Sequence, residues 1–299
     1  VGEVPDTSWL TAVRDAVVRS FPGWDDDEVD VEPLGGGITN RNAVVSVRSL
    51  APRRFVARVP GERTELLGID RASEVEAAVR AAEIGIGPPV LGVLDGYGTL
   101  VTELVPGGHL EPDAFVARLE EVVRLLHRFH GSGPLAGAFP IHRVVEWHAG
   151  DAAAHGVALP GAWPELHEVS SRIERSFPPA DGDLVPCHND LLPGNVLFAD
   201  DRTWLLDFEY AGMNDRFFDL ANLSVNCGLD AAADERLLAL YFGEVDDRRR
   251  AKLAAMKVMS ELREGMWAVV QQAISTLDTD FATYADERLA NAMTLAEQL

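Results

Sequence analysis

The chain reads His-Asn-Asp-Leu-Leu-Pro-Gly-Asn over residues 188–195 and, after two short apolar runs, Asp-Phe-Glu-Tyr over residues 207–210. Asp190 and Asn195 stand five residues apart on a loop that proline and glycine favour, and Asp207 follows a predicted strand. Phosphoryl transfer needs one carboxylate that orients and deprotonates a hydroxyl, and an amide oxygen with a second carboxylate that hold Mg²⁺. Magnesium takes few protein ligands, so Asn195 and Asp207 would suffice. The spacing therefore predicts a phosphotransferase site rather than a loop of turn-forming residues with capping side chains.

Outward from this stretch, the first third of the chain is typical of a small antiparallel sheet. A helical pattern covers residues 7–21, a second one covers 70–84, and Pro106-Gly107-Gly108 is the clearest linker signal. Between them, short apolar or alternating runs predict five strands: Val29–Pro33, Asn42–Val47, Phe55–Val59, Val90–Leu94 and Thr99–Leu104.

The remainder of the chain is typical of a mainly helical domain. Helical patterns are predicted over residues 112–130, 142–154, 163–176, 215–226, 231–243, 247–275 and 280–298, interrupted by a strand-like island over 184–208. We therefore predict an α+β fold with two domains, residues 1–105 and 106–299, and a cleft at their junction.

The composition excludes several function classes. The 299 residues carry 26 Lys+Arg against 48 Asp+Glu, a net charge of −22, which argues against nucleic-acid or anionic-membrane binding. A small anion can still bind in a local pocket. No stretch has the pattern of a signal peptide or of a transmembrane helix, so we predict a cytoplasmic protein without membrane insertion. Two cysteines are too few for a disulfide framework.

Three glycines occur between two predicted strands, in Gly35-Gly36-Gly37-Ile38-Thr39-Asn40. Glycines let a backbone approach phosphate oxygens closely, although an ordinary hairpin is the alternative. A Rossmann turn is excluded because Asn40 stands where its third glycine would be. A Walker A loop is excluded because the only lysines are Lys252 and Lys257.

These motifs resemble the choline/ethanolamine kinases, within the wider aminoglycoside-phosphotransferase-like kinases. Residues 188–195 and 207–210 are similar to their catalytic and metal-binding segments, residues 36–40 to their phosphate loop, and residues 103–107 to their hinge. The resemblance implies a bilobal protein-kinase-like fold, with a small antiparallel-sheet N-lobe and a larger, mainly helical C-lobe. It also implies that ATP and Mg²⁺ are used.

The resemblance assigns roles residue by residue. Asp190 corresponds to the catalytic base, and Asn195 and Asp207 to the magnesium ligands. The expected nucleotide contacts are Gly35, Gly36, Gly37, Thr39 and Asn40 for the phosphates, and the backbone from Glu103 to Val105 for the adenine.

One position departs from the pattern of these kinases. They carry a basic residue, usually lysine, on the third strand, where it holds phosphates and pairs with a helical glutamate. Because this chain has no lysine before residue 252, Arg58 is expected to take that place. Its predicted partner is Glu74, with Glu76 as the fallback.

The acceptor is expected to be a small molecule, an amino alcohol such as choline or ethanolamine. Glu209 should emerge beside the transferred phosphoryl group, and the resemblance adds Trp267 and Tyr284 as aromatic contacts of an ammonium. Core packing is the alternative for Trp267. Glu264 stands where those kinases can carry a tryptophan, which favours a substrate that donates hydrogen bonds over choline. Alternative functions are an aminoglycoside, antibiotic or sugar kinase and a nucleotide-binding pseudokinase.

Overall fold

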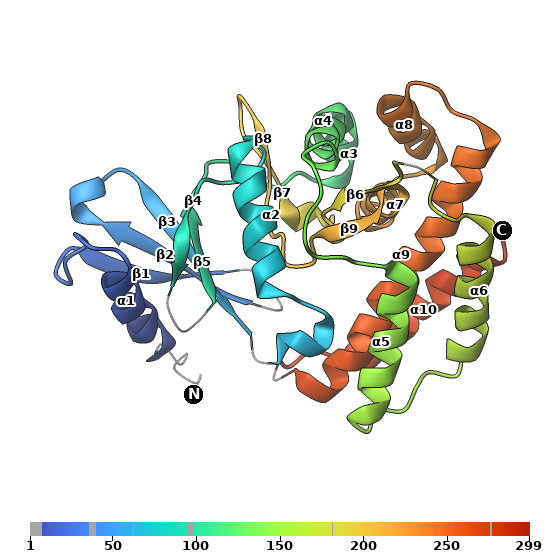
Figure 1. Ribbon diagram of the computed structural model, residues 1–299, viewed down its shortest axis with the longest axis horizontal. Coiled ribbons are helices and arrows are strands. Elements are labelled where there is room, and N and C mark those ends of the chain that lie inside the picture. The colour runs from blue at the N-terminus through green and yellow to red at the C-terminus, as the bar shows by residue number, and fades with distance from the viewer. Residues whose placement is uncertain (1–7, 36–39, 62, 95–97, 181, 276) are drawn as a thin grey trace.

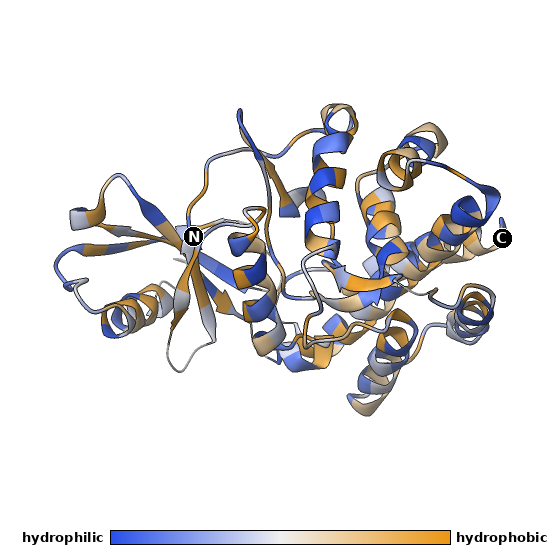
Figure 2. Ribbon diagram, turned by 45° about the horizontal axis from the view of Figure 1, so that its top comes forward, coloured by the Kyte–Doolittle hydropathy of each residue, from blue (hydrophilic) through white to orange (hydrophobic). Residues whose placement is uncertain are grey.

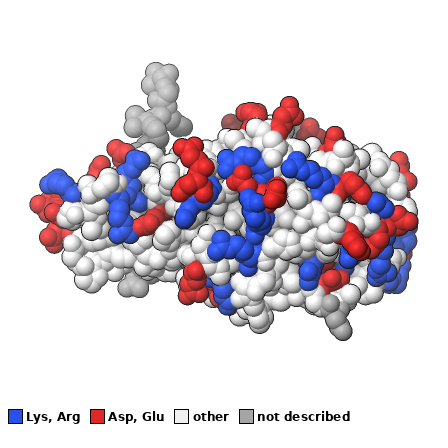
Figure 3. Space-filling view, turned by 90° about the horizontal axis from the view of Figure 1, so that it is seen from above, with Lys and Arg blue, Asp and Glu red and all other residues white. Residues whose placement is uncertain are grey.

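The computed structural model describes residues 8–35, 40–61, 63–94, 98–180, 182–275 and 277–299. An antiparallel sheet occupies one end of the molecule and most of the helices occupy the other (Figure 1). The predicted α+β class is thereby confirmed, whereas the division into domains at residue 105 stays a prediction. Among the described residues, no helix has both the length and the apolar character needed to cross a bilayer. Figure 3 shows basic side chains lying next to acidic ones on the face viewed from above.

The sheet has five strands in the order β1-β2-β3-β5-β4, and every neighbouring pair is antiparallel. The strands are β1 (Val29–Leu34), β2 (Asn40–Val47), β3 (Arg54–Pro60), β4 (Val90–Leu94) and β5 (Thr99–Glu103). Helix α1 (Ser8–Ser20) covers one face, where its Val13 and Val17 pack with Phe55 and Val101. Full burial of a side chain such as Phe55 contributes about 1.5–3 kcal/mol. This small core holds β3 rigidly, and β3 carries Arg58.

Helix α2 (Arg71–Glu83) begins at Asp70, whose side chain accepts a hydrogen bond from the Ala72 amide at 3.0 Å. In Figure 1, α2 lies between the sheet and the helical part. Ala77 and Ala81 on this helix are fully buried in the larger core, which the C-terminal helices build. Helix α2 is therefore held in place from the helical side.

The linker between β5 and the helical part packs against the strand-like island. Gly108 exchanges both backbone hydrogen bonds with Phe198, at 2.9 Å each. Gly107 has a φ of +146°, and a Cβ there would lie 2.7 Å from the Leu197 side chain. Glycine is thus required where the linker crosses the island.

The helical part is built around one long buried helix, α9 (Asp247–Ile274), which contacts α5 (Ile141–Ala154), α7 (Arg216–Asn226) and α10 (Phe281–Ala296). Gly265 lets α9 and α10 approach closely, because a Cβ there would lie 2.7 Å from Leu289. Most helices show separate hydrophilic and hydrophobic faces (Figure 2). The helices are α3 (Pro112–Ala117), α4 (Leu119–His130), α5 (Ile141–Ala154), α6 (Trp163–Ser176), α7 (Arg216–Asn226), α8 (Ala231–Phe242), α9 (Asp247–Ile274) and α10 (Phe281–Ala296).

Two sequence expectations about elements were wrong. The single helix predicted over 112–130 is two helices that meet at Arg118. The Arg118 amide donates to Phe115 O, three residues back, at 3.0 Å, which tightens the turn at this point, and its guanidinium binds Glu121. The island over 184–208 omitted a strand: it contains β6 (Leu184–Cys187), β7 (Val196–Phe198) and β8 (Thr203–Leu205), and β6 pairs with β9 (Gly212–Asp215). Glycine, asparagine and aspartate are poor strand formers, so β9 gives no strand signal.

Candidate active site

A cavity of about 620 Å³ lies between the sheet and the helical part, and residues from both line it. Its lining includes these predicted site residues: Gly35, Asn40, Arg58, Glu74, Glu103, Val105, Asp190, Asn195, Asp207, Glu209 and Trp267. Tyr284 is not among the lining residues. Gly36, Gly37 and Thr39 lie outside the described residues. The structure thus brings residues that are far apart in the sequence to one cavity.

The loop over residues 188–195 is held from below by Asp219 on α7. This carboxylate is fully buried and accepts hydrogen bonds from the amides of His188 at 2.8 Å and Asn189 at 2.7 Å, and from His130 Nε2 at 2.9 Å. Asn189 has a φ of +64°, a strained backbone conformation that these bonds stabilise. The loop is therefore fixed in a shape that presents Asp190 to the cavity.

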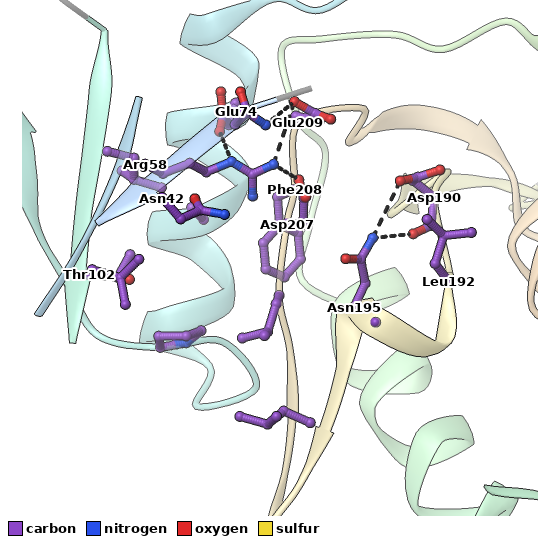
Figure 4. Close-up of a pocket in the computed structure, with 18 of the residues that line it drawn as sticks. Asn42, Arg58, Glu74, Thr102, Asp190, Leu192, Asn195, Asp207, Phe208 and Glu209 are labelled. Carbon is purple, nitrogen blue, oxygen red and sulfur yellow. Dashed lines mark hydrogen bonds and ion pairs between the residues drawn. The ribbon is translucent and has the colours of Figure 1, made fainter. Parts of the chain in front are cut away.

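Asp190 and Asn195 lie side by side on this loop (Figure 4). The Asn195 side-chain amide donates to the Asp190 carbonyl oxygen at 2.8 Å and to Asp190 Oδ2 at 3.3 Å. Asn195 O accepts from the Leu206 amide at 2.9 Å, which brings the loop beside Asp207. Burial raises the pKa of Asp190, and although Arg263 opposes that rise, Glu264 and Asp207 add to it.

Asn195 and Asp207 fit the donor set expected for Mg²⁺. The Asn195 amide nitrogen is engaged by Asp190, which leaves its carbonyl oxygen Oδ1 for another contact. Asp207 supplies a carboxylate from the segment that follows β8, and both residues line the cavity. Oxygen ligands of this kind suit a hard cation. The residues present can therefore hold the metal that the sequence predicts.

Opposite the loop, the guanidinium of Arg58 lies among three carboxylates (Figure 4). It contacts Asp207, Glu209 Oε2 at 3.5 Å and Glu74 Oε1 at 3.7 Å. Burial opposes its charge, but these carboxylates outweigh burial and raise the pKa of Arg58. Glu209 also accepts from Asn40 Nδ2 at 2.8 Å. Burial, together with Asp207, raises the pKa of Glu209.

Glu74, and not the fallback Glu76, is the helical partner of Arg58. The Glu76 carboxylate instead accepts from the Ala136 amide at 3.0 Å and pairs with Arg80 at 3.5 Å. The two glutamates leave the helix in different directions because they are two positions apart.

Arg71 is a second cation in this group, and sequence reasoning missed it. Its Nη1 contacts Glu74 Oε2 at 2.6 Å and Glu209 Oε2 at 3.7 Å, and its Nη2 donates to Thr64 Oγ1 at 2.9 Å. Arg58 and Arg71 therefore share the same two glutamates. No sequence signal distinguished Arg71 from an exposed residue of the first helical turn.

Neither lysine of the chain contributes to the cavity lining. Lys252 pairs with Asp183 at 2.8 Å and Asp215 at 2.6 Å, and Lys257 pairs with Asp234 at 2.7 Å. The cations at the cavity are accordingly arginines.

The hinge segment uses two of its amides inside the fold. The Glu103 amide donates to Pro89 O and the Leu104 amide to Arg54 O, both at 2.8 Å. Contacts of an adenine with this segment would therefore fall to the Glu103 carbonyl and to Val105.

The far end of the cavity is formed by α9 and the segment after Asp207, and α10 packs behind α9. Trp267 Nε1 donates to Tyr210 Oη at 2.9 Å, and Tyr284 Oη donates to Glu264 Oε1 at 2.9 Å. Trp267 is 6% exposed and lines the cavity, so it serves both the core and the cavity wall. Tyr284 contributes to this wall indirectly, through its hydrogen bond to Glu264.

Arg263 is the most buried charged residue at this end, and sequence reasoning missed it too. Its side chain is 1% exposed, and its Nη1 donates to Glu264 Oε2 at 2.9 Å and Asp190 Oδ1 at 3.2 Å. The available signal was an arginine placed four residues before Trp267, on the same face of an apolar helix.

The sequence and the fold are similar to those of known proteins. The model of a family described as the phosphotransferase enzyme family matches residues 30–254. The chain is 26% identical to the protein LicA of Haemophilus influenzae over 280 residues, which cover 88% of this chain and 79% of that protein. It is 26% identical to ethanolamine kinase 2 of Mus musculus over 295 residues, which cover 88% and 75%.

Among solved structures, a choline/ethanolamine kinase family protein from Mesorhizobium loti is 29% identical. It superposes with a TM-score of 0.77, covering 96% of this chain and 94% of that one. The predicted kinase-like arrangement of sheet and helices is confirmed by this similarity.

Proposed function

Because the family match spans residues 30–254, the chain belongs to the phosphotransferase enzyme family, and we propose that it phosphorylates the hydroxyl of a small amino alcohol with ATP. One observation carries the proposal: Asp190, Asn195, Asp207 and Arg58 line the same cavity although they come from different parts of the chain. The named relatives, among them an ethanolamine kinase, support the amino alcohol as acceptor.

In the proposed reaction, the acceptor hydroxyl oxygen attacks the γ-phosphorus, the bond to the bridging oxygen of ADP breaks, and the hydroxyl proton passes to Asp190. Asn195 orients the Asp190 carboxylate through its amide, and Arg58 binds the phosphates from β3. Mg²⁺, held by Asn195 and Asp207, would neutralise charge on the phosphates. The protein contributes positioning and electrostatic stabilisation, which together account for most of the catalysis in this reaction class.

The experiment is a panel of acceptors with Mg-ATP, in which ADP release and the phosphorylated product are both measured. Ethanolamine, choline, an aminoglycoside and a sugar are compared at increasing concentration, and Asp190→Asn serves as the control that lacks the base. Saturable turnover of an amino alcohol that disappears in Asp190→Asn supports the proposal. Turnover of only the aminoglycoside or the sugar contradicts it, as does nucleotide binding without turnover of any acceptor.

A further inference from the structure

The guanidinium of Arg263 lies over the ring of Tyr210, with its Cζ 4.2 Å from the ring centroid. A second aromatic ring, that of Phe139, lies 5.8 Å from the same carbon. An aromatic face within about 6 Å attracts a cation of any origin, whether from a side chain or from a ligand. The protein's own cation therefore already occupies the aromatic face at this end of the cavity.

The position of Arg263 is fixed on several sides. Nη1 contacts both Asp190 and Glu264, at 3.2 and 2.9 Å, and the side chain is 1% exposed. The Tyr210 ring that it covers is in turn held by Trp267, which donates to Tyr210 Oη. Moving the guanidinium away would leave two carboxylates at the cavity without this partner. Arg263 is thus a permanent part of the acceptor end.

This arrangement treats two kinds of ammonium differently. A quaternary ammonium has no N–H, so it relies on aromatic faces and on unpaired negative charge. Here the guanidinium covers the face of Tyr210 that a quaternary ammonium would need, and its charge repels an ammonium of either kind. An ammonium with N–H groups has another option, because it can donate a hydrogen bond directly.

Glu264 is the acceptor for such a hydrogen bond. An ionised carboxylate offers about four lone-pair sites. Among the residues that the structure describes, its oxygens accept from two donors, Tyr284 Oη at 2.9 Å and Arg263 Nη1 at 2.9 Å. Glu264 lines the cavity, so its remaining sites are available to a ligand.

We propose that Arg263 determines acceptor specificity: its guanidinium takes the place on the aromatic wall that a quaternary ammonium would need, so the enzyme selects amino alcohols whose ammonium carries N–H. This inference rests on the proposed function, since it presupposes an amino alcohol as acceptor.

The test compares ethanolamine with its N-methyl, N,N-dimethyl and N,N,N-trimethyl derivatives, the last being choline. The hydroxyl is the same throughout, while the N–H groups fall from three to two, one and none. We expect kcat/KM to change little between the monomethyl and dimethyl compounds. It should then fall about tenfold or more at choline, the equivalent of one hydrogen bond to a charged group. A gradual decline with each methyl group would indicate steric exclusion and would overturn the proposal.

Variants then test whether Arg263 causes the fall in kcat/KM between the dimethyl compound and choline. In Arg263→Met and Arg263→Gln the ratio of kcat/KM between the dimethyl compound and choline should fall about tenfold or more, because the face of Tyr210 no longer carries a cation and becomes available to the trimethylammonium group. These variants also lose the contact with Asp190, which lowers kcat for both substrates alike. This common loss cancels in the ratio. Arg263→Lys keeps a cation at this position and should keep the fall in kcat/KM at choline. Arg250→Met is the matched control, since Arg250 lies on the same helix but is exposed and pairs with Glu235 at 2.7 Å.

An unchanged ratio in both neutral variants would overturn the role of Arg263. If Arg263→Met does not fold, as a melting curve would reveal, Arg263→Gln and the wild-type series decide. Wild-type turnover of choline equal to that of the dimethyl compound refutes the inference but leaves the proposed function intact. Absence of turnover with every member of the series refutes both.

Discussion

Replacing Arg58 with alanine removes the cation that lies between the sheet and the Asp-Phe-Glu segment. In the structure this guanidinium contacts Asp207, Glu209 at 3.5 Å and Glu74 at 3.7 Å. If it also binds the nucleotide phosphates, a hydrogen bond to a charged group worth about 1.5–3 kcal/mol is lost. At 1.4 kcal/mol per factor of ten, the apparent KM for ATP should rise about 10- to 100-fold, and turnover should fall as well.

The effect on stability should be smaller than the loss of an isolated buried ion pair, which costs about 3–5 kcal/mol. Arg71 remains in contact with Glu74 at 2.6 Å and with Glu209 at 3.7 Å, so these two buried carboxylates keep a cation. Asp207 loses its contact with Arg58, but its side chain is partly exposed to solvent. Arg58→Lys retains the charge without the planar fork, and we expect it to keep a substantial part of both ATP affinity and turnover.

The assay measures initial rates against ATP concentration at saturating acceptor, with unfolding in urea measured in parallel. Arg54→Ala is the matched control, because Arg54 lies on the same strand and is exposed. Its ATP profile should equal that of the wild type. An unaltered ATP profile in Arg58→Ala would mean that the phosphates are bound elsewhere, and the assignment of the β3 cation would be wrong.

Four further outcomes are expected. Asp190→Asn should lower turnover by about 10²- to 10⁴-fold with nearly unchanged ATP affinity, as measured by steady-state kinetics. A variant that retains more than about a tenth of wild-type turnover would contradict the role of Asp190 as base. Trp267→Ala should raise the acceptor KM far more than the ATP KM, and equal increases in the two KM values would reduce Trp267 to core packing. Asp219→Asn weakens charge-assisted bonds to the amides of His188 and Asn189, so urea unfolding should show a loss of about 2–4 kcal/mol and turnover should fall; wild-type stability would argue against this support. Burial lowers the pKa of His148 from 6.5 to about 4, so between these pH values the unfolded chain binds a proton that the folded protein does not, and stability falls as the pH drops through this range. Between pH 7 and pH 5, His148→Gln should therefore lose about 2 kcal/mol less stability than the wild type. Equal losses for the two proteins in urea titrations would refute this.

The sequence predicted the parts of the site that local spacing encodes. Asp190, Asn195 and Asp207 stand in one stretch with turn residues and short apolar runs, and that pattern alone specifies the loop. Arg58 and Glu74 followed from the absence of lysine and from a resemblance, and the structure brings them within 3.7 Å of each other.

What the sequence could not reveal depends on tertiary packing. Arg71 looks like an ordinary surface arginine. The spacing of Arg263 from Trp267 places the two on one helix face, but the sequence does not show that this face is buried against carboxylates. Strand β9 forms only because β6 pairs with it, although its residues disfavour strands. The break at Arg118 arises from its contact with Glu121 and the Ala199 carbonyl, the latter distant in the chain.

If Asp207 holds the metal and Arg58 the phosphates, as proposed, the contact between these two residues makes metal and nucleotide uptake interdependent. Each of these groups neutralises the other in the structure. A cation held by Asp207 would weaken the contact of this carboxylate with the guanidinium, and a phosphate held by Arg58 would weaken the same contact from the other side. Each ligand thus sets free the group that the other requires. Because such coupling is reciprocal, the nucleotide strengthens metal binding by the same factor by which the metal strengthens nucleotide binding. Over the physiological range of free magnesium, the affinity for nucleotide should therefore follow the metal concentration.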